Sequence, residues 1–304
     1  MSNGTCDKSY LDEVEIPGID KAFIIRNPSL ENILFNRNLV GLDFTRACEA
    51  ASISFLRHFE QEFQTILSDV AELMLLSKGM YYWLHNAFAA VFDENLQVNF
   101  IATQRINVEG GSADIIIPYS NLDVPVRNLI IGDTIASGAT IKSALSLYQR
   151  HHSLQRLFVF SIAGTVVGGQ AIADYCRSQG IELTLAYGLA AFGLGENGFD
   201  LSFLHPDTIT RDQYRERARI LFSGQPVSAA GWDFGSQAQA LKKYRMLSWL
   251  EAERHGLQES RIFQSKEPPI DGRLVSKERF AFEQDSEAVL NAFEQNSDVV
   301  GRDA

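Results

Sequence analysis

The sequence predicts an α/β fold, with a parallel sheet flanked by helices and a mostly helical C-terminal extension. The main observation is that short continuous apolar runs alternate with helical segments between residues 98 and 189. Such runs are typical of strands that are buried on both faces of a parallel sheet. Loops rich in glycine, hydroxyl or charged residues follow several of these runs. Because ligands bind beyond the carboxyl ends of such strands, we expect the loops to converge on one site.

Composition indicates a globular protein of one large or two small domains. The chain has 304 residues, of which 45% are hydrophobic and 21% charged, both ordinary values. A net charge of −11 argues against nucleic acid as the main partner. No apolar run approaches the ~20 residues of a membrane span, and the N-terminus lacks an apolar export segment. The three cysteines show no Cys-x-x-Cys pattern. We therefore expect a cytoplasmic protein without a membrane partner.

The first part of the chain is expected to contain an arm, two helices and a strand. Residues 1 to about 25 show no clear period and are assigned to the arm. A phenylalanine recurs every four residues in a predicted helix at 45–67, and we assign this stripe to core packing. A strand at 73–76 ends at Ser77-Lys78-Gly79, and a second helix follows.

The remainder of the chain divides into the alternating region and a polar C-terminal region. The expected strands and helices of the alternating region are, in order, strand 98–102, strand 127–131, helix 141–151, strand 157–163, helix 170–178 and strand 183–189. Residues 106–125 between them are irregular. Polar helices are expected at 212–222 and 236–253, before a charged tail that starts near residue 259. We therefore divide the chain into an arm (1–26), a main domain (27–208) and a helical extension (209–304), whose tail we expect to be partly disordered.

Residues 128–140 carry the clearest chemical signal. A β-branched run ends in Asp133, a turn of small residues follows, and a helix then begins. That order places main-chain N–H groups at a helix N-terminus, where they lack internal partners and favour an anion such as phosphate. Ser137 and Thr140 add hydroxyl donors, and Gly138 keeps a side chain out of the loop. The alternative is an ordinary strand–turn–helix in which Ser137 is the N-cap.

This stretch resembles the phosphoribosyl pyrophosphate (PRPP) signature of type I phosphoribosyltransferases, in which an acidic pair and a phosphate loop follow a strand. Gly132 and Asp133 stand at the acidic pair, so the first acid is lost and the second is kept. The resemblance implies that Asp133 binds a ribose hydroxyl and that the loop binds the 5-phosphate. The implied loop residues are Thr134, Ala136, Ser137, Gly138, Ala139 and Thr140.

The resemblance covers about residues 27–207 and is longest to the uracil phosphoribosyltransferase branch. Residues 74–80 are similar to the pyrophosphate loop, which assigns Ser77 and Gly79 to PRPP binding. Residues 98–105 resemble the strand that ends in an arginine near the pyrophosphate. Lys78 and Arg105 are therefore expected to neutralise the leaving group, beside Asp133 as the third catalytic residue.

The same resemblance implies a cover and an acceptor pocket. Residues 106–125 correspond to a mobile hairpin that covers the substrate, and residues 193–199 are similar to the segment before the base-binding loop. The implied acceptor-binding residues are Phe199, Asp200, Leu204 and Asp207.

Four departures from the family pattern concern the chemistry. Ser77 stands where the family usually has arginine, and Ile106 follows Arg105 where aspartate is usual. The uracil branch keeps the first acid and lacks the second, which is the reverse of this chain. Residues 200–207 replace a glycine-rich loop that recognises uracil through its main chain. The acceptor is therefore left open between uracil and a different heterocycle or a phenolic or amide compound.

The implied function is transfer of the 5-phosphoribosyl group from PRPP to a small acceptor, with release of pyrophosphate. Mg²⁺ would be carried by PRPP, without a direct protein ligand. The expected partners are PRPP and the acceptor, in a homodimer or larger homo-oligomer. Two alternatives remain open from the sequence. One is a non-catalytic PRPP- or nucleotide-sensing regulator whose extension contacts a partner, and the other is a phosphate-binding enzyme of another doubly wound class.

Overall fold

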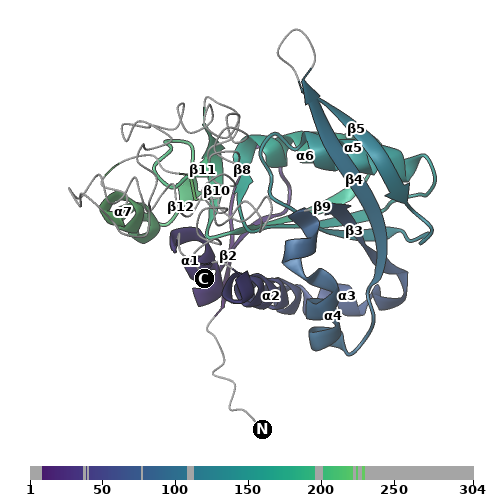
Figure 1. Ribbon diagram of the computed structural model, residues 1–304, viewed down its shortest axis with the longest axis horizontal. Coiled ribbons are helices and arrows are strands. Elements are labelled where there is room, and N and C mark those ends of the chain that lie inside the picture. The colour runs from purple at the N-terminus through teal and green to yellow at the C-terminus, as the bar shows by residue number, and fades with distance from the viewer. Residues whose placement is uncertain are drawn as a thin grey trace, which may run out of the picture.

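The computed structural model describes residues 9–36, 39, 41–76, 78–107, 113–195, 201–221, 224 and 228–229 (Figure 1). The predicted helix at 236–253 and the charged tail therefore lie outside the described residues. The described part is a mixed α/β structure with one large and one small sheet. None of the helices in those ranges is long and apolar enough to span a membrane.

The large sheet has eight strands in the order β1-β2-β9-β7-β6-β3-β4-β5. Its six central strands are parallel, and an antiparallel strand closes each edge. The strands are β1 (Tyr10–Glu13), β2 (Ala22–Arg26), β3 (Val70–Leu76), β4 (Gln97–Asn107), β5 (Ala113–Asn121), β6 (Asn128–Gly132), β7 (Arg156–Ser161) and β9 (Glu182–Gly188). The parallel sheet that the continuous apolar runs predict is confirmed.

Residues 10–26 form an edge of this sheet, although the sequence predicts an arm there. β2 pairs in parallel with β9, and β1 pairs with β2. Arg26 Nε and Nη2 donate hydrogen bonds to Asp12 across the two strands, at 2.6 and 3.0 Å. β1 is short and half-polar, and its stability comes from pairing with β2, so its own sequence shows no strand period.

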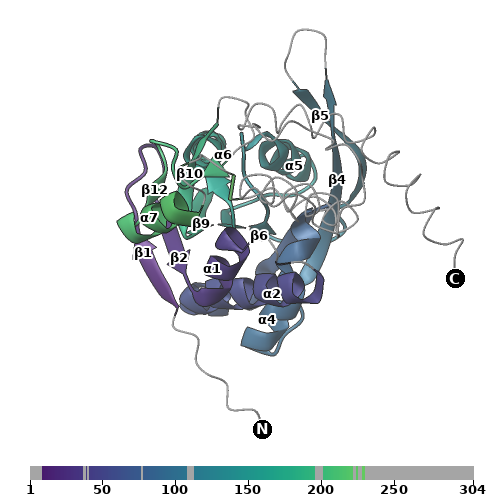
Figure 2. The ribbon, with the colours of Figure 1, turned by 60° about the vertical axis from the view of Figure 1, so that its left-hand side comes forward.

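Helices cover both faces of the large sheet (Figures 1 and 2). On one face lie α1 (Pro28–Phe35), α2 (Gly41–His58), α3 (Glu60–Gln64) and α4 (Leu84–Phe92), and on the other lie α5 (Ala139–Gln149) and α6 (Val166–Gln179). Phe55 stacks on Phe160 with ring centroids 5.0 Å apart, and Phe63 lies 4.6 Å from Phe158. The predicted phenylalanine stripe is therefore core, although it spans two helices and not one. Burial of each such ring contributes about 2–3 kcal/mol.

A small sheet adjoins the large one. It comprises β8 (Gly164–Thr165), β10 (Ala190–Leu194), β11 (Leu201–Ser202) and β12 (Ile209–Thr210), with β10 at its centre. A single bridge between Ile135 and Gly164 joins the loop after β6 to β8. The segment that follows β6 is therefore linked through β8 to the start of β10.

The helix after the small sheet packs into the main core. α7 (Asp212–Leu221) buries Tyr214 and Ala218 in the cluster that includes α1, and the Tyr214 hydroxyl donates to Glu31 at 2.9 Å. Figure 2 shows α7 beside β1 and α1. Residues 212–221, expected in the helical extension, thus contribute to the folded domain.

β4 and β5 form a hairpin that projects from the sheet (Figure 1). β4 pairs with β3 as far as Ala102, and beyond that residue it pairs with β5 alone. The sequence predicts an irregular segment at 106–125, but β5 occupies Ala113–Asn121 of it. The hairpin expected from the family resemblance is therefore present.

Candidate functional site

The 133–140 loop joins the end of β6 to the start of α5. Ala139 is the first residue of α5, and Gly138 is its N-cap with φ 74° and without a side-chain cap. The alternative in which Ser137 caps the helix is therefore wrong. Only glycine adopts this left-handed backbone without strain, so Gly138 lets the chain turn sharply into the helix.

The carbonyl groups at the start of this loop are engaged by the segment after β7. The Thr165 hydroxyl donates to the Ala136 carbonyl, and the Thr165 N–H donates to the Ile135 carbonyl at 3.0 Å. Thr165 is itself the N-cap of α6, because its hydroxyl accepts from the Gly168 N–H at 2.8 Å. One side chain thus fixes both the loop and a second helix N-terminus.

Close backbone contact holds the loop rigidly against α6. A Cβ atom on Gly138 would lie 2.5 Å from the Gly168 carbonyl oxygen, and a Cβ atom on Gly168 would overlap the Ala136 carbonyl oxygen. Both positions must therefore be glycine for the two segments to approach. The sequence identifies Gly138 as permissive but gives no signal for its partner Gly168.

The N–H groups of the loop face away from these contacts. Within the described residues, the main-chain N–H groups of Ala136, Ser137, Gly138, Ala139 and Thr140 have no hydrogen-bond acceptor. Two residues after Thr140, the N–H of Lys142 donates to the Gly138 carbonyl at 3.1 Å, as in a helix ladder. Ser137 is exposed and Thr140 half-buried. Five donors and two hydroxyls at a helix N-terminus form a suitable cradle for a phosphate group.

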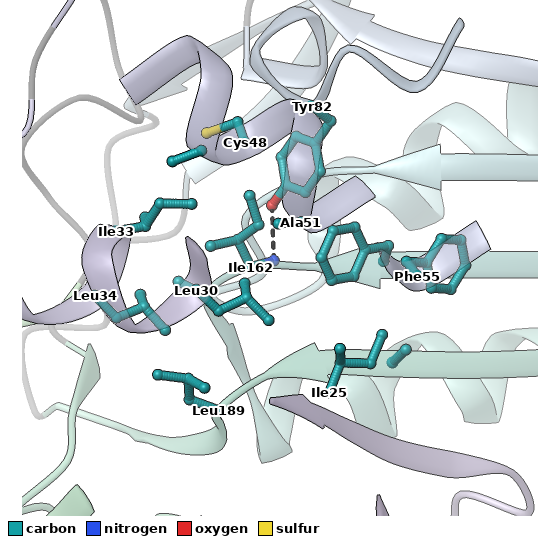
Figure 3. Close-up of a cluster of buried hydrophobic side chains, with 14 of the residues drawn as sticks. Ile25, Leu30, Ile33, Leu34, Cys48, Ala51, Phe55, Tyr82, Ile162 and Leu189 are labelled. Carbon is teal, nitrogen blue, oxygen red and sulfur yellow. Dashed lines mark hydrogen bonds between the residues drawn. The ribbon is translucent and has the colours of Figure 1, made fainter. Parts of the chain in front are cut away.

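Asp133 is fixed at the end of β6. Its N–H donates to the Phe160 carbonyl at 3.2 Å, and its Oδ1 accepts from the Thr134 N–H at 2.8 Å. The residue is 5% exposed. Its charge acts on Tyr82, whose pKa is raised well above the usual value, first by burial and second by Asp133. Tyr82 is therefore neutral beside this carboxylate, and its hydroxyl accepts from the Ile162 N–H at 3.1 Å (Figure 3).

The structure accounts for glycine at the first acidic position. A Cβ atom on Gly132 would lie 2.6–2.7 Å from atoms of the Tyr82 side chain. Tyr82 ends the short 3₁₀ helix η2 (Lys78–Tyr82), and a Cβ atom on Gly79 would lie 3.3 Å from the Gly132 carbonyl. The segment after β3 therefore packs against the end of β6, and Tyr82 occupies the space that a carboxylate at 132 would need.

The predicted cations can be placed only in part. Lys78 begins η2, so its main chain follows β3 close to Gly132, but its side chain lies outside the described residues, as does Ser77. Arg105 lies in the projecting half of β4, opposite Ile115 of β5. Its side chain also lies outside the described part. Gly79 of η2 lies beside Gly132, and Thr134–Thr140 follow Asp133 directly along the chain.

Of the predicted acceptor residues, Leu204 and Asp207 lie in the 202–208 loop between β11 and β12. Leu204 is half-buried, and the Asp207 side chain is 79% exposed. Phe199 and Asp200 lie outside the described residues. The loop is anchored by Phe203, which is fully buried and stacks on Phe35 with ring centroids 4.5 Å apart.

Arg215 of α7 holds the 202–208 loop. Its guanidinium donates to the main-chain carbonyls of Phe203, His205 and Thr208, at 3.0, 3.1 and 2.6 Å. The Thr208 hydroxyl in turn accepts from the Gly193 N–H at 2.8 Å and links the loop to β10. The sequence gives no signal for Arg215, because it is one of several arginines in a polar helix and nothing local distinguishes it.

In the described part of the chain, no group of three or more His, Cys, Asp or Glu residues could hold a metal ion. The carboxylate that the 133–140 loop supplies is that of Asp133. A Mg²⁺ ion there would take most of its ligands from water and from a bound phosphorylated substrate, which is the usual preference of Mg²⁺.

Comparison with known proteins gives structural similarity without sequence relatives. No protein-family model matches the chain, and no curated protein matches it. Among solved structures, adenine phosphoribosyltransferase from Trypanosoma brucei is 12% identical with a TM-score of 0.39, over 68% of this chain and 99% of that one. A hypoxanthine phosphoribosyltransferase from Staphylococcus aureus is 13% identical with a TM-score of 0.33, over 52% and 79%. The AQ2163 protein from Aquifex aeolicus is 14% identical with a TM-score of 0.44, over 57% and 88%.

Proposed function

We propose that this chain is a PRPP-dependent phosphoribosyltransferase that acts on a uracil-like or other small acceptor. The observation that carries the proposal is the set of five main-chain N–H groups at 136–140 beside the fixed carboxylate of Asp133. The N–H groups suit a phosphate monoester, and the carboxylate suits neighbouring sugar hydroxyls. A 5-phosphorylated pentose presents both on one molecule.

In the proposed reaction, a nitrogen of the acceptor attacks the anomeric carbon of PRPP as the bond to pyrophosphate breaks. The sugar gains positive charge while the leaving group gains negative charge. The N–H groups of the 133–140 loop hold the 5-phosphate, and Asp133 accepts from a ribose hydroxyl. Lys78 and Arg105 neutralise the pyrophosphate. The protein therefore acts mainly by positioning and by electrostatic stabilisation.

Mg²⁺ is the proposed cofactor, and it would neutralise the phosphate oxygens of PRPP. Asp133 can orient water or sugar hydroxyls around it. A cytoplasmic location agrees with Cys176, which is a free and buried thiol. A homodimer or larger homo-oligomer remains the expected assembly.

A second candidate is a non-catalytic sensor of PRPP or a nucleotide on the same fold. The packing of Tyr82 against Gly132 favours it, because the space of the first acidic side chain is filled and that carboxylate is absent. This sensor would use the same N–H groups for binding but would not release pyrophosphate.

Calorimetric titration with PRPP and Mg²⁺, followed by pyrophosphate release with a panel of bases, separates these candidates. Binding with turnover supports the enzyme, and saturable binding without turnover on any acceptor supports the sensor. Ala139→Pro provides the sharpest variant, because it deletes one cradle N–H at the first helical position, where proline is best tolerated. We expect PRPP affinity to fall about tenfold. Absence of PRPP binding by the unaltered chain would exclude both candidates.

A further inference from the structure

A groove of about 590 Å³ lies between the hairpin and α5, apart from the site described above. Its walls come from β5, α5 and Tyr175 of α6. Ile115, Ile117 and Leu147 supply apolar surface, and Ser120, Ser143 and Ser146 supply hydroxyls. Apart from the covering role expected for residues 106–125, neither the sequence motifs nor the proposed reaction uses these side chains.

The groove carries two cations on a protein of net charge −11. Lys142 and Arg150 line it from the same helix, and Arg150 is exposed. They are eight residues apart on α5, which places their Cα atoms about 12 Å from one another along the helix axis. Two separated positive charges with apolar surface between them suit an extended acidic and apolar partner better than one compact anion.

The chain itself contains a segment of this kind. Residues 281–298 include five carboxylates (Glu283, Asp285, Glu287, Glu294 and Asp298) and no lysine or arginine. Phe282, Val289, Leu290 and Phe293 are interspersed among them. Between Ala229, the last described residue, and residue 281 lie the 51 residues 230–280. An extended connection of that length could span roughly 170 Å, so reach does not limit docking.

We infer that residues 281–298 dock in this groove of the same chain, with carboxylates opposite Lys142 and Arg150 and apolar side chains against Ile115, Ile117 and Leu147. The occupied groove would also attach β5 to α5 on the outer side of the hairpin.

Hydrogen–deuterium exchange of the full-length protein tests this inference. Lys142→Glu with Arg150→Glu reverses both charges, and we expect exchange in 281–298 to become on the order of tenfold faster. The matched control is Arg46→Glu with Arg57→Glu, which changes the net charge equally at exposed positions of α2 on the opposite face of the sheet. The control should leave exchange in 281–298 unchanged.

A charge swap makes the test specific. Adding Glu287→Lys and Glu294→Lys to the groove variant should restore slow exchange in 281–298. Equal exchange of this segment in the unaltered protein and the groove variant would overturn the inference. Protection that increases with protein concentration would also overturn it, because the segment would then come from a second copy. Slower exchange of 113–121 and 142–150 on addition of inorganic phosphate, without any effect on 281–298, would assign the groove to a small anion instead.

Discussion

The 133–140 loop and the 202–208 loop lie on neighbouring sheets, but they are held in different ways. In the first, glycines allow direct backbone contact with α6, and the exposed functional groups are main-chain N–H groups. In the second, Phe203 stacks on Phe35, Thr208 accepts from Gly193, and Arg215 of α7 donates to the main chain. The 133–140 loop, which we propose binds PRPP, therefore depends on backbone shape. The 202–208 loop, which we propose contacts the acceptor, depends on tertiary contacts that can vary without loss of the fold.

The largest expected effect concerns Asp133. Asp133→Asn keeps an oxygen that can accept from the Thr134 N–H, so the loop should retain its shape. The variant lacks the negative charge, and we expect turnover to fall by about 10²–10³ while the melting temperature changes little. Pyrophosphate release and thermal denaturation measure the two quantities. Unchanged turnover would show that the carboxylate has no role at the sugar and that only the backbone of this loop acts.

The next effect concerns the fit between Gly132 and Tyr82. Gly132→Ala places a methyl group 2.6–2.7 Å from the tyrosine side chain, and we expect a loss of about 2 kcal/mol in the free energy of unfolding. Gly180→Ala is the control, because Gly180 has open space around it and φ 67°. We expect Gly180→Ala to lower the free energy of unfolding by about 1 kcal/mol, from backbone strain alone. A Gly132→Ala loss no larger than the control, in urea denaturation, would mean that Tyr82 does not exclude the first acid.

A smaller effect is expected at Arg215. Arg215→Gln removes most of the donors to the three carbonyls of the 202–208 loop, and we expect a loss of about 1–2 kcal/mol in stability. PRPP affinity should stay within about twofold, because the 133–140 loop does not use this residue. Arg219→Gln, at an exposed position of α7 whose partner is Glu216, should change stability by less than about 0.5 kcal/mol. A tenfold loss of PRPP affinity in Arg215→Gln would show that the two loops are coupled.

The same contrast explains what the sequence could predict. The strand, turn and helix around Asp133 are encoded within thirteen consecutive residues (128–140), so both their order and their chemistry are visible locally. The true N-cap was missed because Gly138 depends on the carbonyl of Gly168, far along the chain. β1 and α7 were placed in appendages because their stability comes from Arg26, Glu31 and the core around α1. Arg215 could not be predicted for the same reason, because its three acceptors are main-chain carbonyls, which every residue has.

The smallest expected effect is on the pH dependence of the free energy of unfolding. Glu72 lies in β3, and its side chain is fully buried. β3 leads to η2, the segment that packs against Gly132 at the end of β6. Nδ1 of His85 lies 3.8 Å from its Oε2, beyond hydrogen-bond length, and no hydrogen-bond partner of the carboxylate lies in the described part of the chain. Burial raises the pKa of Glu72, and the neighbouring Glu72 raises the pKa of His85.

Because both folded-state pKa values are raised, the folded protein binds more protons than the unfolded chain. The stability linked to this pair is therefore fully present below the unfolded pKa of glutamate, 4.5, and is lost as pH rises through the folded values. Glu72→Gln should flatten the decline of the unfolding free energy between about pH 4 and 8, by roughly 1 kcal/mol. Glu62→Gln, at an exposed position of α3, controls for the loss of one charge and should leave the slope unchanged. PRPP binding of Glu72→Gln over the same pH range should follow its stability, since β3 supports the segment that packs on Gly132. In the contrary outcome, only the stability of Glu72→Gln would lose its pH dependence, and PRPP affinity would keep the original profile. PRPP binding would then be independent of β3, and the backbone of the 133–140 loop alone would account for that binding.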